Sequence, residues 1–187
     1  MKTIAVIPAR FAATRFPGKL MHKIGDKTII RMVYENAVKC GIFNQVLVVT
    51  DSDVIFKEIE LLGGFVKMSR VEHSSGSDRI AEAIVDLDVD VVVNIQGDEP
   101  FIMKEPLTDL LDCFKDNNVL VASLMKKIED DENINNPNVV KVVCNRANDA
   151  LYFSRSAIPF KRNTQSTLPY FKHIGVYAFR KQTLLEF

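Results

Sequence analysis

The chain has 187 residues, of which 47% are hydrophobic and 26% are charged. Such values are typical of a globular chain with a core of its own and exclude disordered and collagen-like classes. Lys and Arg together number 24, as do Asp and Glu, so the formal net charge is zero. We therefore expect no nucleic-acid partner, because a nucleic-acid-binding surface needs a basic excess. Any phosphate must be bound by a few well-placed cations.

Membrane and secretion signals are absent from the sequence pattern. No apolar run approaches the roughly 18 residues of a membrane span. The start, MKTIAVIPARF, lacks the apolar length of a signal peptide. Three cysteines, Cys40, Cys113 and Cys144, show no CxxC spacing and predict neither a disulfide framework nor a zinc site. We expect a cytoplasmic protein without membrane attachment.

Short apolar runs alternate with amphipathic segments over the first part of the chain. The predicted strands and helices, in chain order, are strand Thr3–Ile7, helix Thr28–Lys39, strand Gln45–Thr50, helix Asp53–Leu62, strand Phe65–Met68, helix Ser77–Val85, strand Val91–Ile95 and a helix with Pro106 at its first position. Alternation of this kind predicts an α/β fold with a doubly wound, mostly parallel sheet.

The pattern changes from Val119 onward, where strands follow one another with few helices between them. The polar stretch Asp130–Asn138 is predicted to be a loop, and Lys161–Leu168 a mobile or interface-forming excursion. This part of the chain predicts a mixed sheet, and without repeats or a linker we expect a single domain over residues 1–187. Its predicted strands are Val119–Leu124, Val139–Val143, Leu151–Phe153 and Ile174–Phe179.

Three cations, Arg10, Arg15 and Lys19, follow the end of the first predicted strand within ten residues. Ligands of a doubly wound sheet bind beyond the carboxyl ends of its strands. Converging cations at such a place suit a triphosphate, whose oxygens need several charged donors. The segment fits neither a Walker loop nor a GxGxxG turn. The alternative is a solvated surface loop.

Two adjacent carboxylates, Asp98 and Glu99, follow the predicted central strand. Carboxylate oxygens suit Mg²⁺, which keeps several waters and takes oxygen ligands. The alternative is an acidic turn in which Gly97 and Pro100 shape the backbone. A cationic phosphate loop opposite these carboxylates favours the metal, because metal and triphosphate bind together.

A hydroxyl-rich loop, Ser69–Arg79, precedes the third predicted helix. Its Ser and Asp residues are ordinary helix caps, and a second interpretation places them beside a nucleotide base. Spacing alone favours the caps. His173 precedes the last predicted strand, and the pattern around it predicts no more than a surface histidine.

Seven stretches together resemble the 3-deoxy-manno-octulosonate (Kdo) cytidylyltransferase family, the CMP-Kdo synthetases, over nearly the whole chain. The first stretch is shared with sialic acid and other sugar cytidylyltransferases, and the last two are more specific to the Kdo branch. They are IPARFAATRFPGK (Ile7–Lys19), VVTD (Val48–Asp51), HSSGSDR (His73–Arg79), NIQGDEP (Asn94–Pro100), NPNVVKVV (Asn136–Val143), LYFSRSAIP (Leu151–Pro159) and HIGVYAFR (His173–Arg180).

The resemblance implies a nucleotide-diphospho-sugar transferase (Rossmann-like) fold and a Mg²⁺-dependent transfer of CMP from CTP to an acidic sugar. The product would be CMP-Kdo, made for lipopolysaccharide biosynthesis, and the protein a homodimer paired near Leu151–Pro159. The implied site residues are Pro8, Ala9, Arg10, Arg15, Lys19, Ser75 and Gly76 for the nucleotide, Arg15, Lys19 and Asp98 for catalysis, Asp98 for the metal, and Gln96, Arg155, His173 and Tyr177 for the sugar.

Members of this family continue for several tens of residues past the position of Phe187, and that segment carries a second metal carboxylate. We therefore expect the 187 residues to lack the family's C-terminal segment. Three alternatives stay open: another acidic sugar (sialic, pseudaminic or 8-amino-Kdo), a chain that binds nucleotide without catalysis, and a sugar transferase of similar α/β shape that binds a nucleotide sugar.

Overall fold

The computed structural model describes residues 1–11, 16–73, 75–129, 131–160, 162 and 168–186. They form two compact units, one of Met1–Ala122 with Val176–Phe187 and one of Ser123–Gly175. The chain passes from one unit to the other within two strands, β7 (Val121–Ile128) and β10 (Tyr170–Arg180). The single domain expected from the sequence stays a prediction.

The first unit is built on a mostly parallel sheet, as the sequence predicts. Its central strand, β1 (Thr3–Ala9), pairs in parallel with β4 (Gln45–Thr50) and with β6 (Val91–Asn94). β5 (Phe65–Met68) continues the parallel arrangement beyond β4, and β10 is antiparallel to β6. The order is β5-β4-β1-β6-β10. The mixed α/β fold with parallel strands at its centre is therefore confirmed.

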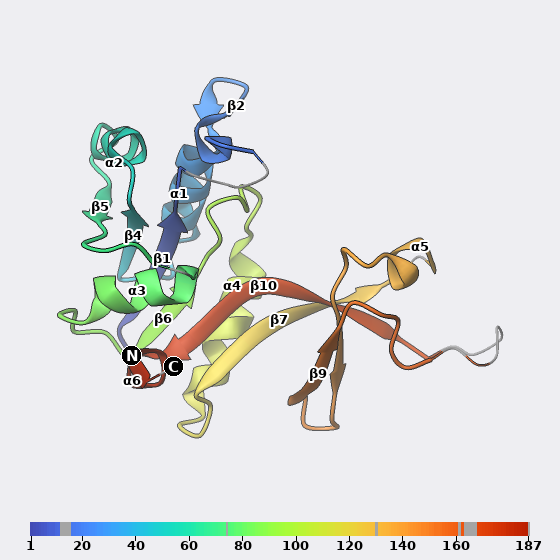
Figure 1. The fold of residues 1–187 in the computed structure, drawn as a ribbon. Helices are drawn as coiled ribbons and strands as arrows, with labels where there is room; N and C mark the ends of the chain where they lie inside the picture. Colours follow the sequence, from blue (N-terminus) through green and yellow to red (C-terminus); the bar gives the residue numbers. More distant parts are fainter. Residues whose placement is uncertain (12–15, 74, 130, 161, 163–167, 187) are drawn as a thin grey trace. The chain divides into compact units, whose positions relative to one another are not determined.

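Both faces of this sheet are covered, which explains why β1 is apolar along its whole length. Ile4 and Val6 pack with Ile80 and Ile84 of α3, while Ala5 and Ile7, which point to the opposite face, are also fully buried. α3 crosses one face of the strands, and α1 lies on the other side (Figure 1). The helices of the unit are α1 (Ile29–Cys40), α2 (Asp53–Glu60), α3 (Gly76–Ile84), α4 (Lys104–Asp112) and α6 (Lys181–Glu186).

Element boundaries differ from expectation at a few places. Strands β4 and β5 match the predicted ranges, but α4 begins at Lys104, so Pro106 is its third residue. Proline is tolerated there because the first four N–H groups of a helix have no partner within it. The sequence pattern did not indicate α6, the short 3₁₀ helices η1 (Lys19–Met21) and η2 (Cys113–Lys115), or a hairpin of β2 (Lys23–Ile24) and β3 (Lys27–Thr28).

The second unit is antiparallel. β8 (Lys141–Cys144) pairs with β10 and with β9 (Ala150–Ser154), and β7 pairs with β10. The predicted loop Asp130–Asn138 instead contains a short helix, α5 (Asp131–Asn135).

The predicted excursion Lys161–Leu168 falls outside the described residues, apart from Arg162 and Leu168. Within the described part of the chain, no helix has the length and apolar character needed to cross a membrane.

Candidate functional site

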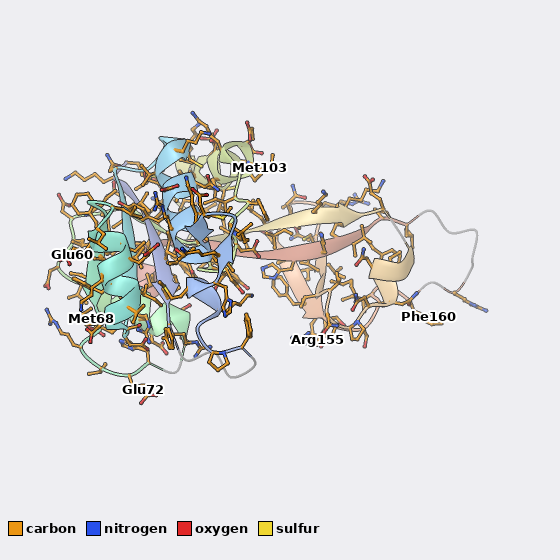
Figure 2. The ribbon with its side chains drawn as sticks, turned by 90° about the horizontal axis from the view of Figure 1, so that it is seen from above. Glu60, Met68, Glu72, Met103, Arg155 and Phe160 are labelled. Atoms are coloured by element: carbon orange, nitrogen blue, oxygen red, sulfur yellow. The ribbon has the colours of Figure 1, made fainter. Side chains whose placement is uncertain are left out.

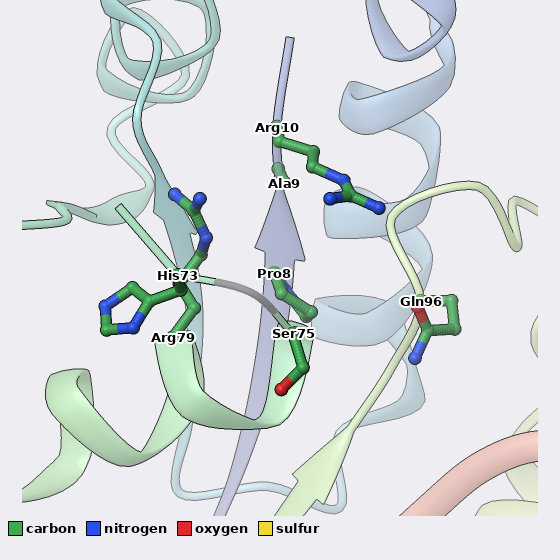
Figure 3. A pocket seen from close by; sticks show the side chains of 8 residues that line it. Pro8, Ala9, Arg10, His73, Ser75, Arg79 and Gln96 are labelled. Atoms are coloured by element: carbon green, nitrogen blue, oxygen red, sulfur yellow. The ribbon is translucent and has the colours of Figure 1, made fainter. Parts of the chain in front are cut away.

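A pocket opens at the carboxyl edge of the parallel strands in the first unit (Figure 3). Its cavity volume is about 90 Å³, below the roughly 300–1,000 Å³ of typical small-molecule sites, so it would enclose only part of a nucleotide. The loops that follow β1, β5 and β6 form it, as the rule for ligand sites in such sheets predicts. Its lining residues are Pro8, Ala9, Arg10, His73, Ser75, Gly76, Arg79 and Gln96.

The structure thus brings together most of the residues predicted to contact the nucleotide. Pro8 and Ala9 end β1 and Arg10 follows them, while Ser75 caps α3 and Gly76 is the first residue of that helix. Arg15, predicted for the nucleotide and for catalysis, lies outside the described residues.

Two glycines allow the three loops to approach each other closely at Pro8. A Cβ atom on Gly76 would lie 3.3 Å from Cγ of Pro8. A Cβ atom on Gly97, in the loop after β6, would lie 3.1 Å from the Pro8 carbonyl oxygen and 3.2 Å from Cδ1 of Leu20. Any side chain at Gly97 would therefore have to push its loop away from main-chain atoms of β1.

Ser75 serves the fold and lines the pocket at once. Its hydroxyl accepts a hydrogen bond from the Asp78 N–H, and the Asp78 carboxylate accepts one from the Ser75 N–H, both at 3.2 Å. This reciprocal capping box fixes the start of α3. The interpretation of this loop as a helix cap is confirmed, and the same residue lies in the pocket wall.

Arg79 is a pocket residue that the sequence reasoning missed. Only 3% of it is exposed. Its Nη2 donates to the Asp51 carboxylate at 2.5 Å, and its Nη1 donates to the Ser69 hydroxyl at 2.8 Å. The guanidinium therefore joins the ends of β4 and β5 to the first turn of α3. The sequence did contain the two partners, because Asp51 ends the VVTD stretch and Arg79 ends the HSSGSDR stretch.

His73, a second missed residue, is held by Glu82. The Glu82 carboxylate contacts Nε2 of His73 and accepts a hydrogen bond from the Arg70 N–H at 2.7 Å. Burial raises the pKa of Glu82, but these two hydrogen bonds outweigh it and leave the pKa below its ordinary value. Glu82 thus stays ionised and holds the loop after β5 in place.

Lys19 and Asp98 meet beside this pocket. The Lys19 Nζ lies 2.6 Å from Oδ2 of Asp98, and the side chains are 42% and 44% exposed. Lys19 begins η1, and Asp98 follows β6, so a cation of the loop after β1 faces a carboxylate across the same sheet edge. This is the arrangement that the sequence predicts for a triphosphate and its metal.

The donor set around Asp98 fits a metal that arrives with phosphate. Among the residues that the structure describes, no group of three or more His, Cys, Asp or Glu side chains could enclose a metal ion. Mg²⁺ is usually bound by one or two carboxylates together with substrate phosphates and water. The half-exposed Asp98 carboxylate, already beside a positive charge, can supply such a ligand.

Two of the residues predicted to bind the sugar belong to the first unit. Gln96 lines the pocket and donates from Nε2 to Oδ1 of Asn94 at 3.2 Å. Tyr177, on β10, is directly opposite Asn94 in the strand register. Its ring stacks with Phe179, and burial raises the pKa of its hydroxyl.

The other two, Arg155 and His173, belong to the second unit. The exposed Arg155 (Figure 2) donates from Nη1 to the Pro137 carbonyl at 3.0 Å. His173 is partly buried, which corrects the surface histidine suggested by its sequence pattern. Its Nε2 is 2.9 Å from the Ser123 hydroxyl, its ring packs edge-on against Phe153, and burial lowers its pKa.

Comparison with known proteins decides the family. A family model described as cytidylyltransferase matches residues 4–187. The 3-deoxy-manno-octulosonate cytidylyltransferase of Flavobacterium johnsoniae is 57% identical over 190 residues, covering the whole chain and 78% of the relative. The chain belongs to the 3-deoxy-manno-octulosonate cytidylyltransferase family. The protein of that name from Christiangramia forsetii is 50% identical, over the whole chain and 76% of its own length.

Solved structures agree with this membership. A structure of CMP:2-keto-3-deoxy-manno-octonic acid synthetase complexed with CTP superimposes with a TM-score of 0.92 at 39% identity. The superposition covers 98% of this chain and 76% of the chain in that structure. The 4-diphosphocytidyl-2C-methyl-D-erythritol synthase of Anaerococcus prevotii, at 15% identity and a TM-score of 0.62, shares the fold alone.

Proposed function

We propose that this chain transfers CMP from CTP to 3-deoxy-manno-octulosonate, giving CMP-Kdo and pyrophosphate. The observation that carries the proposal is the Lys19–Asp98 pair at 2.6 Å, beside a pocket built from the predicted nucleotide residues. Relatives that carry the name of this activity support it, as does the CTP complex of a relative with the same fold. We expect the product to serve lipopolysaccharide biosynthesis in the cytoplasm.

The nucleotide would lie along the pocket, with its base beside Ser75 and Gly76 and its phosphates towards Arg10, Arg15 and Lys19. Small residues on the base side leave room for a planar ring. Cations on the other side neutralise the phosphate oxygens. Arg10 begins this cationic side immediately after the end of β1.

Asp98 would hold Mg²⁺, which when bound neutralises negative charge on the phosphate oxygens. Without nucleotide, the Lys19 ammonium balances the charge of this carboxylate. When the triphosphate arrives, Lys19 can turn to its oxygens and stabilise the departing pyrophosphate together with Arg15. Asp98 would thus pair with Lys19 in the free protein and be available to hold the metal once the nucleotide is bound.

In the reaction, a sugar hydroxyl oxygen forms a bond to the α-phosphorus of CTP as the bond to pyrophosphate breaks in line. Such a transfer is promoted chiefly by positioning and charge neutralisation. Arg155 is the best candidate partner for the sugar carboxylate, because a guanidinium pairs with it in bidentate fashion. Gln96, His173 and Tyr177 stay predicted sugar contacts, as the family resemblance implies.

We also propose a homodimer paired through β9. Leu151, Tyr152 and Phe153 of this strand are 63%, 64% and 44% exposed. β9 has β8 on one side and ends the strand order of its sheet. Apolar side chains on an edge strand favour contact with a second chain.

The activity is tested by supplying CTP and Mg²⁺ with each acidic sugar in turn and following pyrophosphate release. We expect release with 3-deoxy-manno-octulosonate at a rate far above that with sialic or pseudaminic acid. Preference for another sugar would reassign the substrate. CTP binding without any release would support the non-catalytic alternative.

The metal assignment is tested with Asp98→Asn, Lys19→Ala and, as a control from the same loop, Glu99→Gln. We expect Asp98→Asn and Lys19→Ala each to lower turnover by on the order of a hundredfold, and Glu99→Gln to change it little. Mn²⁺ titrated with CTP should bind to Lys19→Ala but not to Asp98→Asn. Normal metal dependence in Asp98→Asn would contradict the assignment of Asp98.

A further inference from the structure

Lys141, at the start of β8, is completely buried in the second unit. Its ammonium donates to three main-chain carbonyl oxygens: those of Asn136 at 2.9 Å, Val139 at 2.8 Å and Arg155 at 2.7 Å. An ammonium has three N–H donors, so these contacts use all of them. The group is therefore held in one position.

Burying an amine that carries a charge is costly, and burial lowers the pKa of Lys141. Apolar residues of similar size could fill the same volume without this cost. They could not, however, donate to the three carbonyl groups. The lysine is thus best explained by what it fixes, which is the turn Asn136–Val139 and the main chain at Arg155.

The same turn also holds the other end of Arg155. Nη1 of Arg155 donates to the Pro137 carbonyl at 3.0 Å. Pro137 lies between the two turn residues that accept from Lys141. The turn is shaped further by bonds from the Asn138 N–H to the Asn136 side chain and from the Val139 N–H to the Asn136 carbonyl. Arg155 is therefore fixed at its backbone by Lys141 and at its guanidinium by the turn that Lys141 organises.

We propose that Lys141 is a positioning residue for recognition of the acidic sugar: by fixing the Arg155 backbone and the Asn136–Val139 turn, it presents the Arg155 guanidinium to the sugar carboxylate. This inference rests on the proposed function and adds to it a residue that would contact no substrate. A displaced guanidinium weakens sugar binding steeply, because a misplacement of about 1 Å can cost on the order of a hundredfold.

The test begins with Lys141→Met, compared with Lys127→Met as a control. Lys127 is an exposed lysine on β7 of the same unit. We expect Lys141→Met to raise KM for the sugar about tenfold or more and to leave the Kd of CTP within about twofold of wild type, since the CTP pocket is built from the first unit. Lys127→Met should change neither constant.

A double-mutant cycle with Arg155→Met distinguishes positioning from general stabilisation. If Lys141 acts through Arg155, Lys141→Met should cost little further sugar affinity once Arg155 is methionine. An equal cost in both backgrounds would overturn the proposal. So would an unchanged sugar KM in Lys141→Met alone.

Folding is followed in parallel by circular dichroism and CTP binding. Should Lys141→Met fail to fold, Lys141→Gln, which keeps two N–H donors, takes its place in the cycle. Loss of structure in both variants would show a stabilising role for Lys141 and overturn the proposal. Failure of the proposed function has a different result, because the wild-type protein would then release no pyrophosphate with this sugar.

Discussion

Arg79 and Lys141 are the buried charged side chains among the described residues, and their partners differ in kind. Arg79 is neutralised by Asp51 and bonded to Ser69, whereas Lys141 donates to main-chain carbonyls. Arg79 joins α3 to the ends of β4 and β5, and Lys141 joins the Asn136–Val139 turn to the main chain at Arg155. Each side chain is held in place by several hydrogen bonds and so fixes the segments that it contacts. Each also lies in a compact unit that contains residues predicted to contact a substrate.

The sequence predicts the partners of exposed charged residues at strand ends better than it predicts the partners of buried charged residues. The proximity of Lys19 and Asp98 follows from one rule, because both residues come after strands whose carboxyl ends share an edge. The Arg79–Asp51 pair spans 28 positions and two loops. No periodic pattern shows that this arginine turns back towards an earlier strand, so sequence reasoning missed it.

At residue scale, His173 predicts a pH dependence of stability. Its pKa in the folded protein lies below the ordinary value of 6.5, because burial disfavours the imidazolium. At a pH between the pKa of His173 in the folded protein and its ordinary pKa of 6.5, the unfolded chain binds more protons than the folded protein. The contribution of His173 to the free energy of unfolding is therefore complete above pH 6.5 and decreases as the pH falls below it. Urea unfolding across this range measures the effect.

The matched variant is His173→Gln, which keeps an N–H donor near Ser123 and cannot titrate. We expect its stability to fall less than that of wild type as the pH drops below 6.5. His22 and His73 are present in both proteins, so the difference isolates His173. Parallel curves would show that His173 is not held neutral by the fold.

At element scale, strands were predicted more accurately than short helices. β4 and β5 are continuous runs with apolar residues between turn signals, and their limits match. α5 and η1 are single turns, too short to show a helical repeat in the sequence. The short helix that begins at Lys19 therefore becomes visible only in the structure, although the sequence already predicted that Lys19 faces Asp98.

We expect a single methyl group added at Gly97, in the loop after β6, to lower the affinity for CTP. In Gly97→Ala, the new Cβ would meet the Pro8 carbonyl at 3.1 Å and Leu20 at 3.2 Å, so the loop must move. We expect CTP affinity with Mg²⁺ to fall about tenfold, since Asp98 moves with its neighbour. Calorimetric titration measures this.

Gly175→Ala is the control for that experiment, because a Cβ at Gly175 meets nothing within 4 Å. Its CTP affinity should equal that of wild type. Equal affinity in Gly97→Ala as well would show that the close approach at Pro8 does not set the position of Asp98.

At the scale of the whole molecule, the exposed apolar strand β9 predicts self-association. Leu151→Ser removes one of its exposed side chains and should shift sedimentation from dimer towards monomer. Leu61→Ser is the matched control, because Leu61 is 85% exposed at the end of α2, far from β9 in sequence and in the other unit. A wild-type protein that sediments as a monomer at micromolar concentration would rule out the proposed homodimer.

Sequence reasoning predicted the architecture of the first unit because periodicity, caps and strand-end residues all indicated the same fold. It could not predict the division of the chain into two compact units. That division falls inside β7 and β10, which are continuous strands without a glycine- or proline-rich linker between them. A boundary within a strand leaves no compositional signal.

The contact between Lys19 and Asp98 has a consequence for the charge around Asp98 under the proposed function. Asp98 already has a positive partner in Lys19, so if it holds Mg²⁺ as proposed, binding would exchange one positive partner for another. In that case the Asp98 carboxylate would have a cation beside it both before and after the nucleotide binds.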